Sequence, residues 1–567
     1  MLNPPSLSTA LYVCMLTSVA YAIDNGLGSV PGLGWNSDYC TKCEGTGLGG
    51  FENEAFIHHI AAYLNTSGLA TLGYRYVNMD ASWNLPERNA AGDWQPNPSL
   101  WPSGIDVTID YVHSLSLGFG LYGDRGSKDC AGMPGNLGHE TGDAAFLARH
   151  AVDWYKSDSC YAAADHATAF AEYGTMRDAL NKTGRPIWFA LCGWNSWYAP
   201  VGMSLGNSWR VGVDTGSGWA AIMSNVNDMV SGGPNGATLA AYGRPSEGGG
   251  GWNDMSLLLN PGMGSGSSLM SNDRHRSQFG LHCIFNANML LTGNLSALDP
   301  FVLDTWGNAE AVAVNQDVSH IFMVLPVDSQ VSSAKKNYNE GYVFASVAEC
   351  GGEPGAQNWT FNSPLTNFIF NSASNQCLNV DDCGTQIIYD ACTIKGTTCA
   401  GNDKFNNEEW TLSPSGALIS SLPGALCATV VKDNLVTLES CASPLPATQM
   451  WQYMVSTGEL VTGAGLCLTV GSAPPPPSLN SLVVSRQLAG AGEWAILALN
   501  NAAVNTTFAC GVTCLASMNI SSSSILHVRD IWEHQDLPDA GGSGGLSITV
   551  GANGTSRFLK ITVAAAA

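Results

Sequence analysis

The sequence predicts a multidomain protein in which a (β/α)8 barrel, at about residues 27–320, is followed by two further β-rich domains. The chain has 567 residues, which is more than one domain usually holds. In the first part, short apolar runs alternate with helix-like segments, a pattern typical of a barrel. Beyond it, Cys and Trp recur in three similar blocks, and alternating strand patterns follow. A doubly wound sheet is the alternative for the first part, but no Gly-x-Gly-x-x-Gly pattern follows its first strand.

Residues 1–22 have the features of a secretory signal peptide. An apolar run from Leu11 to Leu16 leads into Ala20-Tyr-Ala22, a small-residue cleavage pattern. No Lys or Arg precedes the run, so a buried strand or an anchor is the alternative. Cys14 lies in this segment, which leaves an even number of cysteines, and seven Asn-x-Ser/Thr sequons follow. We therefore expect a secreted protein or one in the lumen of the secretory or lysosomal pathway.

The amino-acid composition excludes several classes of binding partner and substrate. Only 12% of residues are charged and the formal net charge is -23, which argues against nucleic acid and against anionic substrates. No later apolar run reaches the roughly 18–20 residues of a membrane span. The chain has no HExxH motif, and its lone Cys40-Thr-Lys-Cys43 is interpreted as a loop disulfide or free thiols, so neither a metal nor a cofactor is expected. The 64 Gly, 17 Trp and 17 Tyr indicate many tight turns and flat apolar surfaces, which suit the binding of carbohydrate.

Several predicted barrel strands end in a carboxylate, at Asp80, Asp124 and Asp158. The ends of barrel strands converge on one mouth, where active sites lie. Lys156 and Asp158 are two residues apart, so their side chains share one face of a strand. A structural ion pair is the alternative for these two residues, but burial of such a pair is costly. Convergence of three strand ends favours an active site.

A second carboxylate, Asp214, closes the segment that contains Arg210, although a surface Arg–Asp pair is the alternative. Retaining hydrolysis of a glycosidic bond uses two carboxyls about 5–5.5 Å apart, a nucleophile and an acid/base. Asp158 suits the nucleophile, because Lys156 would hold it ionised. Asp214 would then be the acid/base, with a pKa expected to be raised by burial and by the nearby negative charge.

Residues 31–317 resemble glycoside hydrolase family 27, the α-galactosidases and α-N-acetylgalactosaminidases. The matching motifs occur in the family's order: Gly32–Ser37, Leu72–Asp80, Leu121–Gly135, Lys156–Cys160, Met176–Pro186, Gly206–Asp214, Gly250–Asp254 and Ala313–Asp317. The resemblance implies Asp158 as nucleophile, Asp214 as acid/base and a disulfide between Cys130 and Cys160. It implies an oligosaccharide or glycoconjugate substrate that is contacted by Trp35, Asp80, Tyr122, Lys156, Gly193, Arg210 and Asp254.

The pocket departs from the family at several positions. Asp38 stands where a second Trp is usual, Ala81 replaces a second Asp, Gly193 replaces the Glu of α-galactosidases, and Ser256 replaces an Asp. Each hydrogen bond lost to a sugar hydroxyl costs about 1–3 kcal/mol. Gly193 is expected to leave room beside the sugar's C2. Ala81 is expected to remove a hydrogen-bonding carboxylate near the sugar's C4 and C6. Alternatives to a terminal α-D-galactoside are therefore an N-acetyl-α-galactosaminide, a β-L-arabinopyranoside, or a catalytically weak carbohydrate-binding protein.

Residues 340–472 hold three imperfect blocks that resemble the Gln-x-Trp repeats of a ricin-type β-trefoil. The blocks close at Gln357-Asn-Trp359, Glu408-Glu-Trp410 and Gln449-Met-Trp451. One repeat is split between the two ends, so a circularly permuted, inserted module is expected. The predicted disulfides are Cys377–Cys392, Cys427–Cys441 and Cys350–Cys467, with Cys383–Cys399 left over. A glycan ligand is expected beside Asp381 or Asp382, for which a turn Asp is the alternative.

The last domain, 478–567, follows a short Pro474–Pro477 linker. Its alternating apolar pattern predicts an antiparallel β-sandwich, in which Cys510 and Cys514 are expected to form a disulfide. Its role is expected to be packing, and a homodimer is one option for the assembly.

Overall fold

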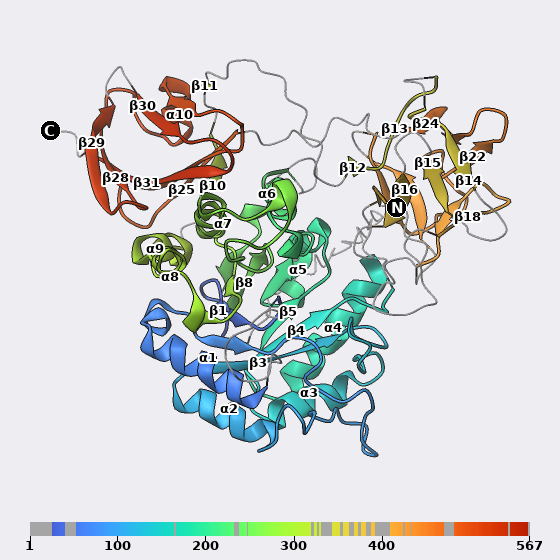
Figure 1. Ribbon diagram of the computed structural model, residues 1–567, viewed down its shortest axis with the longest axis horizontal. Helices are drawn as coiled ribbons and strands as arrows, with labels where there is room; N and C mark the ends of the chain where they lie inside the picture. Colours follow the sequence, from blue (N-terminus) through green and yellow to red (C-terminus); the bar gives the residue numbers. More distant parts are fainter. Residues whose placement is uncertain are drawn as a thin grey trace, which may run out of the picture.

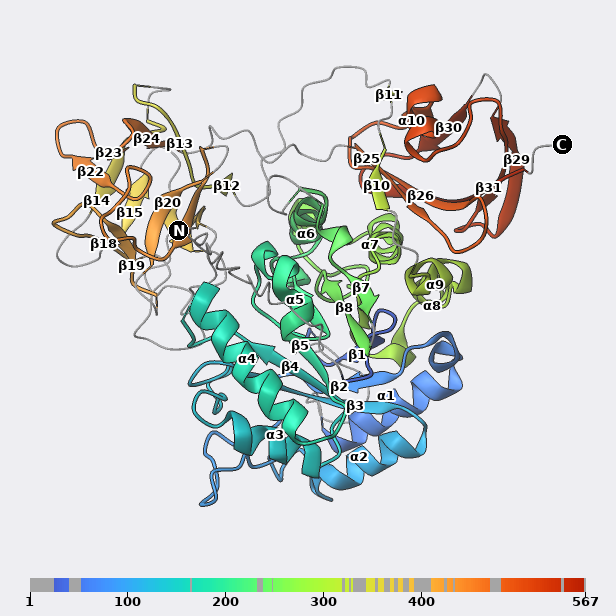
Figure 2. The ribbon, with the colours of Figure 1, turned by 180° about the vertical axis from the view of Figure 1, so that it is seen from behind.

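The computed structural model describes most of the chain. The described residues are 25–39, 53–163, 166–231, 238–246, 248–318, 322–325, 328–329, 343–351, 355–361, 368–371, 376–380, 387–391, 409–422, 426–431, 434–469, 481–541 and 545–564. Figures 1 and 2 show three parts, with the barrel below and the two β domains on opposite sides above it. The proposed signal peptide and the Cys40–Cys43 pair lie outside the described residues.

A ring of parallel strands forms the first part, which confirms the predicted (β/α)8 barrel. From β1 to β6 each strand pairs with the next, β6 pairs with β8, and β1 also pairs with β9. The ring closes where Leu258 forms a parallel bridge with Leu291. The strands are β1 (Leu33–Asn36), β2 (Tyr76–Asn78), β3 (Gly118–Asp124), β4 (Trp154–Asp158), β5 (Trp188–Leu191), β6 (Ser208–Arg210), β8 (Gly249–Asp254) and β9 (Met289–Leu291), with β7 (Arg244–Ser246) antiparallel to β8.

Helices lie around this ring, with one between each parallel strand and the next (Figure 1). Side-chain caps set several of their starts; Asn53 accepts from the Phe56 N–H and Ser271 from the Arg274 N–H. The helices are α1 (Glu54–Thr66), α2 (Ile105–Ser114), α3 (Glu140–Arg149), α4 (His166–Lys182), α5 (Ala199–Leu205), α6 (Trp219–Ser231), α7 (Asn272–Ile284), α8 (Pro300–Trp306) and α9 (Ala309–Gln316). Short 3₁₀ helices lie at Leu69–Leu72, Ser196–Tyr198, Thr215–Ser217, Leu239–Ala241, Gly266–Ser268 and Leu295–Ala297.

Two antiparallel sheets form the C-terminal domain, as the alternating pattern predicted. One has the order β10-β25-β26-β31-β28-β29 and the other β11-β27-β30. A disulfide joins Cys510 and Cys514 beside α10 (Val512–Ser517). The strands are β10 (Phe322–Val324), β11 (Asp328–Ser329), β25 (Ser481–Gln487), β26 (Glu493–Asn500), β27 (Thr506–Cys510), β28 (Ile525–Asp530), β29 (Gln535–Gly541), β30 (Leu546–Val550) and β31 (Thr555–Val563).

The sandwich packs on the barrel through a common buried cluster and has a second hydrophobic core of its own. Trp532 and Phe558 belong to the same buried cluster as the barrel residues. Polar contacts cross the boundary as well: Arg486 Nε donates to Ile284 O at 2.8 Å, and Ser277 Oγ donates to Gly554 O at 2.6 Å. The sandwich therefore supports the face of the barrel formed by α7.

The middle part contains three small antiparallel sheets around a separate core. Trp359, Trp410 and Trp451 occupy matching positions, because each buried indole N–H donates to a backbone oxygen, of Leu468, Leu378 and Ala428 respectively. The strands are β12 (Val343–Phe344), β13 (Ser346–Glu349), β14 (Trp359–Phe361), β15 (Ile369–Asn371), β16 (Gln376–Val380), β17 (Ile387–Ala391), β18 (Trp410–Leu412), β19 (Leu418–Ser420), β20 (Cys427–Val430), β21 (Val436–Glu439), β22 (Trp451–Met454), β23 (Glu459–Thr462) and β24 (Leu466–Thr469).

The two ends of this module lie side by side. Strand β13 pairs with β24, and a disulfide joins Cys350 to Cys467; a second disulfide joins Cys427 to Cys441. These are two of the pairings expected from the sequence. Three of the four cysteines in the other predicted pairs, and both candidate sugar-binding Asp residues, lie outside the described residues: Cys383, Cys392, Cys399, Asp381 and Asp382.

Candidate active site

The carboxyl ends of the barrel strands bring most of the predicted polar residues together. Asp80 follows β2, Tyr122 lies on β3, and Lys156 and Asp158 lie on β4. Lys156 Nζ donates to Asp80 Oδ2 at 2.9 Å and lies 5.0 Å from the centre of the Tyr122 ring. Lys156 therefore forms its ion pair with Asp80, the carboxylate on the strand two positions away, and its charge reaches Asp158 over a longer distance.

Asp158 accepts hydrogen bonds at both carboxylate oxygens, and the Cys192 thiol is a further hydrogen-bonding neighbour. Tyr122 OH donates to Oδ2 at 3.0 Å, and the Ser159 N–H donates to Oδ1 at 2.9 Å. The side chain is nearly fully buried. Burial raises the pKa of Asp158, and the positive charge of Lys156 only partly offsets this effect. Lys156 therefore lowers the pKa of Asp158, as the sequence suggested, but desolvation, which the sequence did not show, has the larger effect.

Asp214 follows β6 and lies at the open side of the mouth, with its side chain 44% exposed. Arg210 Nη2 contacts Asp214 Oδ1 at 2.7 Å. Burial would raise the pKa of Asp214, but the charges of Arg210 and Lys156 and the Arg210 hydrogen bond outweigh it, so the pKa is lowered. The predicted rise in pKa was wrong because the sequence did not show this ion pair in place.

Arg210 connects Asp214 to the floor of the mouth. Its guanidinium is buried, and Nη1 contacts Cys192 Sγ at 3.6 Å. Cys192 is a free, buried thiol that follows β5, and sequence reasoning did not single it out. Asp254, at the end of β8, accepts a hydrogen bond from the Ser256 N–H at 2.7 Å. Burial raises the pKa of Asp254, and the charge of Arg210 only partly offsets this rise.

Asp38 adds a further carboxylate beside Asp80. Asn36 joins the two residues: its Nδ2 donates to Asp80 Oδ2 at 3.0 Å, and its Oδ1 accepts from the Asp38 N–H at 2.7 Å. Burial, followed by the charge of Asp80, raises the pKa of Asp38 to about 7. The sequence showed Asp38 only as a lost aromatic residue, whereas the structure places an ionisable group at the mouth.

Trp35 is the one predicted sugar contact that the structure places elsewhere. It is fully buried, and its indole N–H donates to Gly293 O at 2.8 Å. Its ring packs 6.0 Å from that of Phe56, on helix α1. Because neighbouring strand residues point to opposite faces, Asn36 faces the mouth and Trp35 faces the helices. Trp35 therefore supports the barrel wall and does not line the pocket.

The space beside Gly193 is occupied. A Cβ atom at this position would lie 1.9 Å from Tyr198 Cε2. Tyr198 is itself buried, with edge-on contacts to the rings of Phe170 and Tyr173. The expectation that Gly193 opens room for a substituent at C2 was thus wrong, since an aromatic ring from the following 3₁₀ helix fills that volume.

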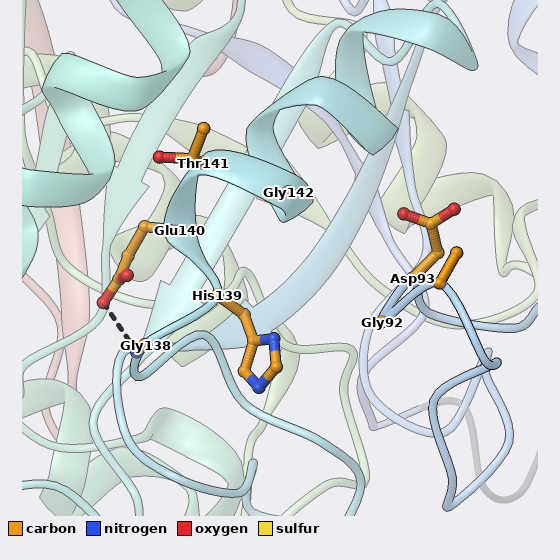
Figure 3. A pocket seen from close by; sticks show the side chains of 8 residues that line it. Gly92, Asp93, Gly138, His139, Glu140, Thr141 and Gly142 are labelled. Atoms are coloured by element: carbon orange, nitrogen blue, oxygen red, sulfur yellow. Dashed lines mark hydrogen bonds between the residues drawn. The ribbon is translucent and has the colours of Figure 1, made fainter.

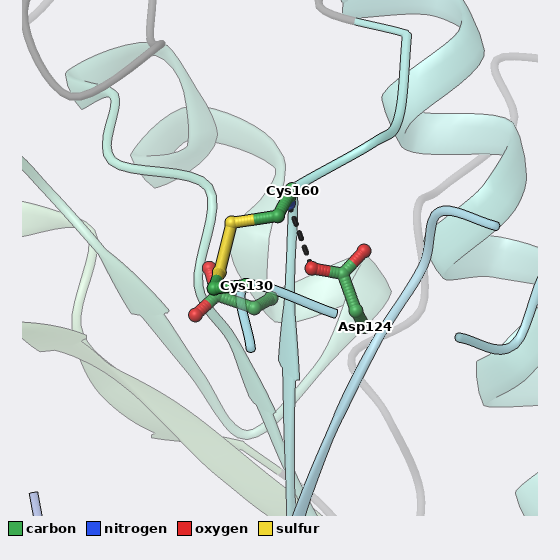
Figure 4. A group of neighbouring side chains, drawn as sticks. Asp124, Cys130 and Cys160 are labelled. Carbon is green, nitrogen blue, oxygen red and sulfur yellow. Dashed lines mark hydrogen bonds between the residues drawn. A yellow bond between two sulfur atoms is a disulfide. The ribbon is translucent and has the colours of Figure 1, made fainter. Parts of the chain in front are cut away.

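Asp124 and a disulfide lie directly beside the nucleophile candidate. Asp124 accepts from the Cys160 N–H at 2.7 Å and the Gly126 N–H at 2.6 Å, and Cys160 is disulfide-bonded to Cys130 (Figure 4). The disulfide is the pairing that the family resemblance implied. Asp124, Asp158 and the two sulfurs lie within 4.8 Å of one another. Because the sulfurs are bonded to each other, they are not thiolates, and the group does not suit a metal ion.

A small surface pocket of about 200 Å³ lies apart from these residues. Ala91, Gly92 and Asp93 line one side, and the segment from Gly138 to Gly142, at the start of α3, lines the other (Figure 3). It contains none of the predicted site residues. The strand-end cluster is therefore the candidate active site.

A (β/α)8 barrel with two carboxylates at its mouth is an arrangement that glycoside hydrolases use. The comparisons with known proteins agree: the family profile described as alpha galactosidase A matches residues 31–317, and the alpha galactosidase C-terminal beta sandwich domain matches residues 480–559. The chain belongs to the α-galactosidase A family, which confirms the resemblance stated from its motifs.

Individual relatives support this assignment. The chain is 33% identical over 338 residues to a probable α-galactosidase of Dictyostelium discoideum, covering 59% of this chain and 78% of that protein. It is 36% identical over 300 residues to an α-galactosidase of Cyamopsis tetragonoloba, covering 52% and 67%.

Solved structures share the fold. α-Galactosidase I of Mortierella vinacea superposes with a TM-score of 0.60 at 19% identity, covering 96% of this chain and all of that one. A β-L-arabinopyranosidase of Geobacillus stearothermophilus superposes with a TM-score of 0.57 at 15% identity, covering 96% and 99%. In the described part of the chain, every helix is too short or too polar to cross a bilayer.

Proposed function

We propose that the protein is a retaining exo-glycosidase that removes terminal α-D-galactosyl residues. The observation that carries this proposal is the pair Asp158 and Asp214 at one barrel mouth. Asp158 is buried and hydrogen-bonded, whereas Asp214 is partly exposed, as suits a group that exchanges a proton with a leaving group or water. The named activity of the relatives points to the same substrate class.

In the first step, an Asp158 oxygen attacks the anomeric carbon and forms an ester bond. The bond between that carbon and the glycosidic oxygen breaks, and the leaving oxygen takes the proton of Asp214. Tyr122, which donates to Asp158 Oδ2, holds the carboxylate in position. Because Asp214 must first be protonated, its 2.7 Å contact with Arg210 has to weaken when sugar occupies the mouth.

In the second step, the Asp214 carboxylate takes a proton from water. The water oxygen attacks the anomeric carbon, the ester bond breaks and Asp158 leaves as a carboxylate. The lowered pKa of Asp214 beside Arg210 describes the ionised form with which this step begins. Two inversions at the anomeric carbon retain its configuration.

The filled space at Gly193 favours a sugar with a small substituent at C2. The N-acetyl-α-galactosaminide alternative depended on open space beside Gly193, and the ring of Tyr198 occupies that space. The β-L-arabinopyranoside alternative is unaffected, because that sugar differs from galactose in lacking the C6 carbon. Asp38 and Asp80 are the carboxylates beside Asn36 that can accept hydrogen bonds from sugar hydroxyls.

A panel of p-nitrophenyl glycosides tests the proposal: the α-D-galactoside, the N-acetyl-α-D-galactosaminide and the β-L-arabinopyranoside. The wild-type protein should act best on the galactoside and release the α-anomer first, as observed by NMR. Asp158→Asn and Asp214→Asn should each lose most of the activity. If no glycoside is turned over while sugars still bind, the rival proposal of a catalytically weak carbohydrate-binding protein holds.

We further propose that residues 340–472 form a circularly permuted β-trefoil that binds glycan. The three equivalent Trp positions and the pairing of β13 with β24 support this assignment. A glycan array with the full chain, compared with an Asp381→Ala/Asp382→Ala variant, tests the expected pocket. A loss of array binding without loss of hydrolysis is the expected result.

Passage through the secretory route is proposed for the same chain. Four disulfides within the described residues are consistent with an oxidising compartment. Expression in a eukaryotic secretory host should yield a glycosylated protein that begins after Ala22. Light scattering of that product decides between a monomer and the proposed homodimer.

A further inference from the structure

Arg125 contacts the end of strand β4, where Asp158 lies. Arg125 directly follows β3, the strand next to β4. Its backbone N–H donates to Asp158 O at 3.0 Å, and its side-chain Nε donates to Ser159 Oγ at 2.9 Å. One residue thus holds the backbone of the nucleophile candidate and the side chain that follows it.

The guanidinium of Arg125 is itself anchored. Its side chain is 3% exposed and forms an ion pair with Glu172 of α4. Nη2 also donates to Ala163 O, and the guanidinium carbon lies 5.5 Å from the centre of the Tyr173 ring. A buried cation with this many partners has one favoured position, because any movement would leave its charge unpaired.

Tyr173 extends the same support to the strand. Its hydroxyl donates to Ser157 O at 3.1 Å and lies 2.9 Å from Ser159 Oγ. Ser157 and Ser159 therefore contact α4, whereas Lys156 and Asp158 alternate with them and face the mouth. The Ser159 N–H then donates to Asp158 Oδ1 at 2.9 Å, so a displacement of Ser159 changes the direction of the Asp158 carboxylate.

We propose that Arg125, together with Glu172, is a positioning pair that fixes the Asp158 carboxylate for attack on the anomeric carbon. The proposal rests on the proposed function of Asp158 as nucleophile. Arg125 acts through Ser159 and the backbone of Asp158, and its guanidinium lies against Glu172 and Tyr173 of α4. Its contribution is therefore to the rate of ester formation and not to sugar binding.

The test compares Arg125→Lys with the wild-type protein on an aryl α-galactoside. Lysine keeps the charge near Glu172 but cannot reach Ser159 and Ala163 at the same time. We expect kcat to fall about 10- to 100-fold with KM little changed, because small misplacements of a reacting group have effects of this size. An activated fluoro-sugar that leaves a slowly hydrolysed ester on Asp158 should label the variant more slowly by the same factor.

Arg185→Lys is the matched control, because it disturbs the opposite end of the same strand. Arg185 Nε donates to Val152 O at 2.8 Å, and Nη2 forms an ion pair with Asp153, directly before β4. This variant should lower the thermal midpoint without changing kcat or the labelling rate. If Arg125→Lys behaves in the same way, its role is merely structural and the proposal is overturned.

Two further measurements keep the outcomes separate. If Arg125→Lys does not fold, Ser159→Ala removes only the hydroxyl that Arg125 and Tyr173 hold; an unchanged kcat in this variant overturns the proposal. If the fluoro-sugar does not label Asp158 in the wild-type protein, the proposed nucleophile is wrong, which is a failure of the proposed function. If the fluoro-sugar labels Asp158 in the wild type and labels Arg125→Lys and Ser159→Ala at the same rate, the positioning role is contradicted. The proposed nucleophile then still stands.

Discussion

The hydrogen bond from Tyr122 to Asp158 provides a direct test of what sets the pKa of the proposed nucleophile. The hydroxyl lies 3.0 Å from Asp158 Oδ2, and both side chains are buried. A donor to a carboxylate stabilises the ionised form and so lowers its pKa. Tyr122→Phe removes that donor while leaving the ring beneath Lys156 in place, so it should raise the pKa of Asp158 further above its ordinary value.

The size of the effect follows from the strength of the bond. A hydrogen bond to a charged group contributes about 1.5–3 kcal/mol. Since one pKa unit corresponds to about 1.36 kcal/mol, the pKa of Asp158 should rise by about 1–2 units in Tyr122→Phe. The acidic limb of kcat/KM reports the group that must be ionised in the free enzyme, so this limb should move to higher pH by that amount.

The assay is the pH dependence of kcat/KM on an aryl α-galactoside, together with thermal unfolding. Tyr155→Phe is the control, since Tyr155 is a buried tyrosine of the same strand β4 whose hydroxyl donates to Asn136. It should lower stability without moving the limb. An acidic limb that stays in place in Tyr122→Phe, with activity retained, would show that Asp158 is not the ionising nucleophile or that Tyr122 does not stabilise it.

Three further predictions concern other charges and the packing at the mouth. Burial raises the pKa of Asp38 to about 7, so ionising it destabilises the fold as pH rises from about 4 to 7; Asp38→Asn should raise the thermal midpoint at pH 8 but not at pH 4. Hydrogen bonds from Arg529 lower the pKa of Glu310 to about 2, so its contribution is complete above about pH 4.5 and is lost as pH falls towards 2. In Glu310→Gln, the melting temperature should change less between about pH 2 and pH 4.5 than in the wild-type protein. Gly193→Ala should destabilise the protein by about 1–3 kcal/mol in denaturant unfolding, because its Cβ would overlap Tyr198, whereas Gly142→Ala, with open space around it, should not.

Local patterns were sufficient to locate the catalytic candidates. Lys156 and Asp158 stand two residues apart at the end of an apolar run, and strand geometry alone places them on one face. Asp214 was found because its motif follows in order. The barrel and the sandwich were also predictable, since alternating segments and short-range turn chemistry determine which elements form.

Errors arose where a side chain has two possible faces or where desolvation competes with charge. Trp35 and Asn36 are neighbours, and only the assembled sheet shows which of them faces the helices. The opposite pKa shifts of Asp158 and Asp214 depend on how far each carboxylate is buried and on where Lys156 and Arg210 lie. Neither burial nor that placement can be read along the chain.

By itself, the sequence indicated the barrel, the C-terminal sandwich and the two candidate carboxylates, because these follow from periodicity and from motifs of a few residues. Only the tertiary structure decided that Lys156 pairs with Asp80, that Tyr198 fills the space at Gly193, and that Arg125, paired with Glu172, contacts Ser159 and the backbone of Asp158. The physical reason is that these contacts join separate elements of the barrel. Their energies depend on distance and desolvation, which exist only once the barrel has closed.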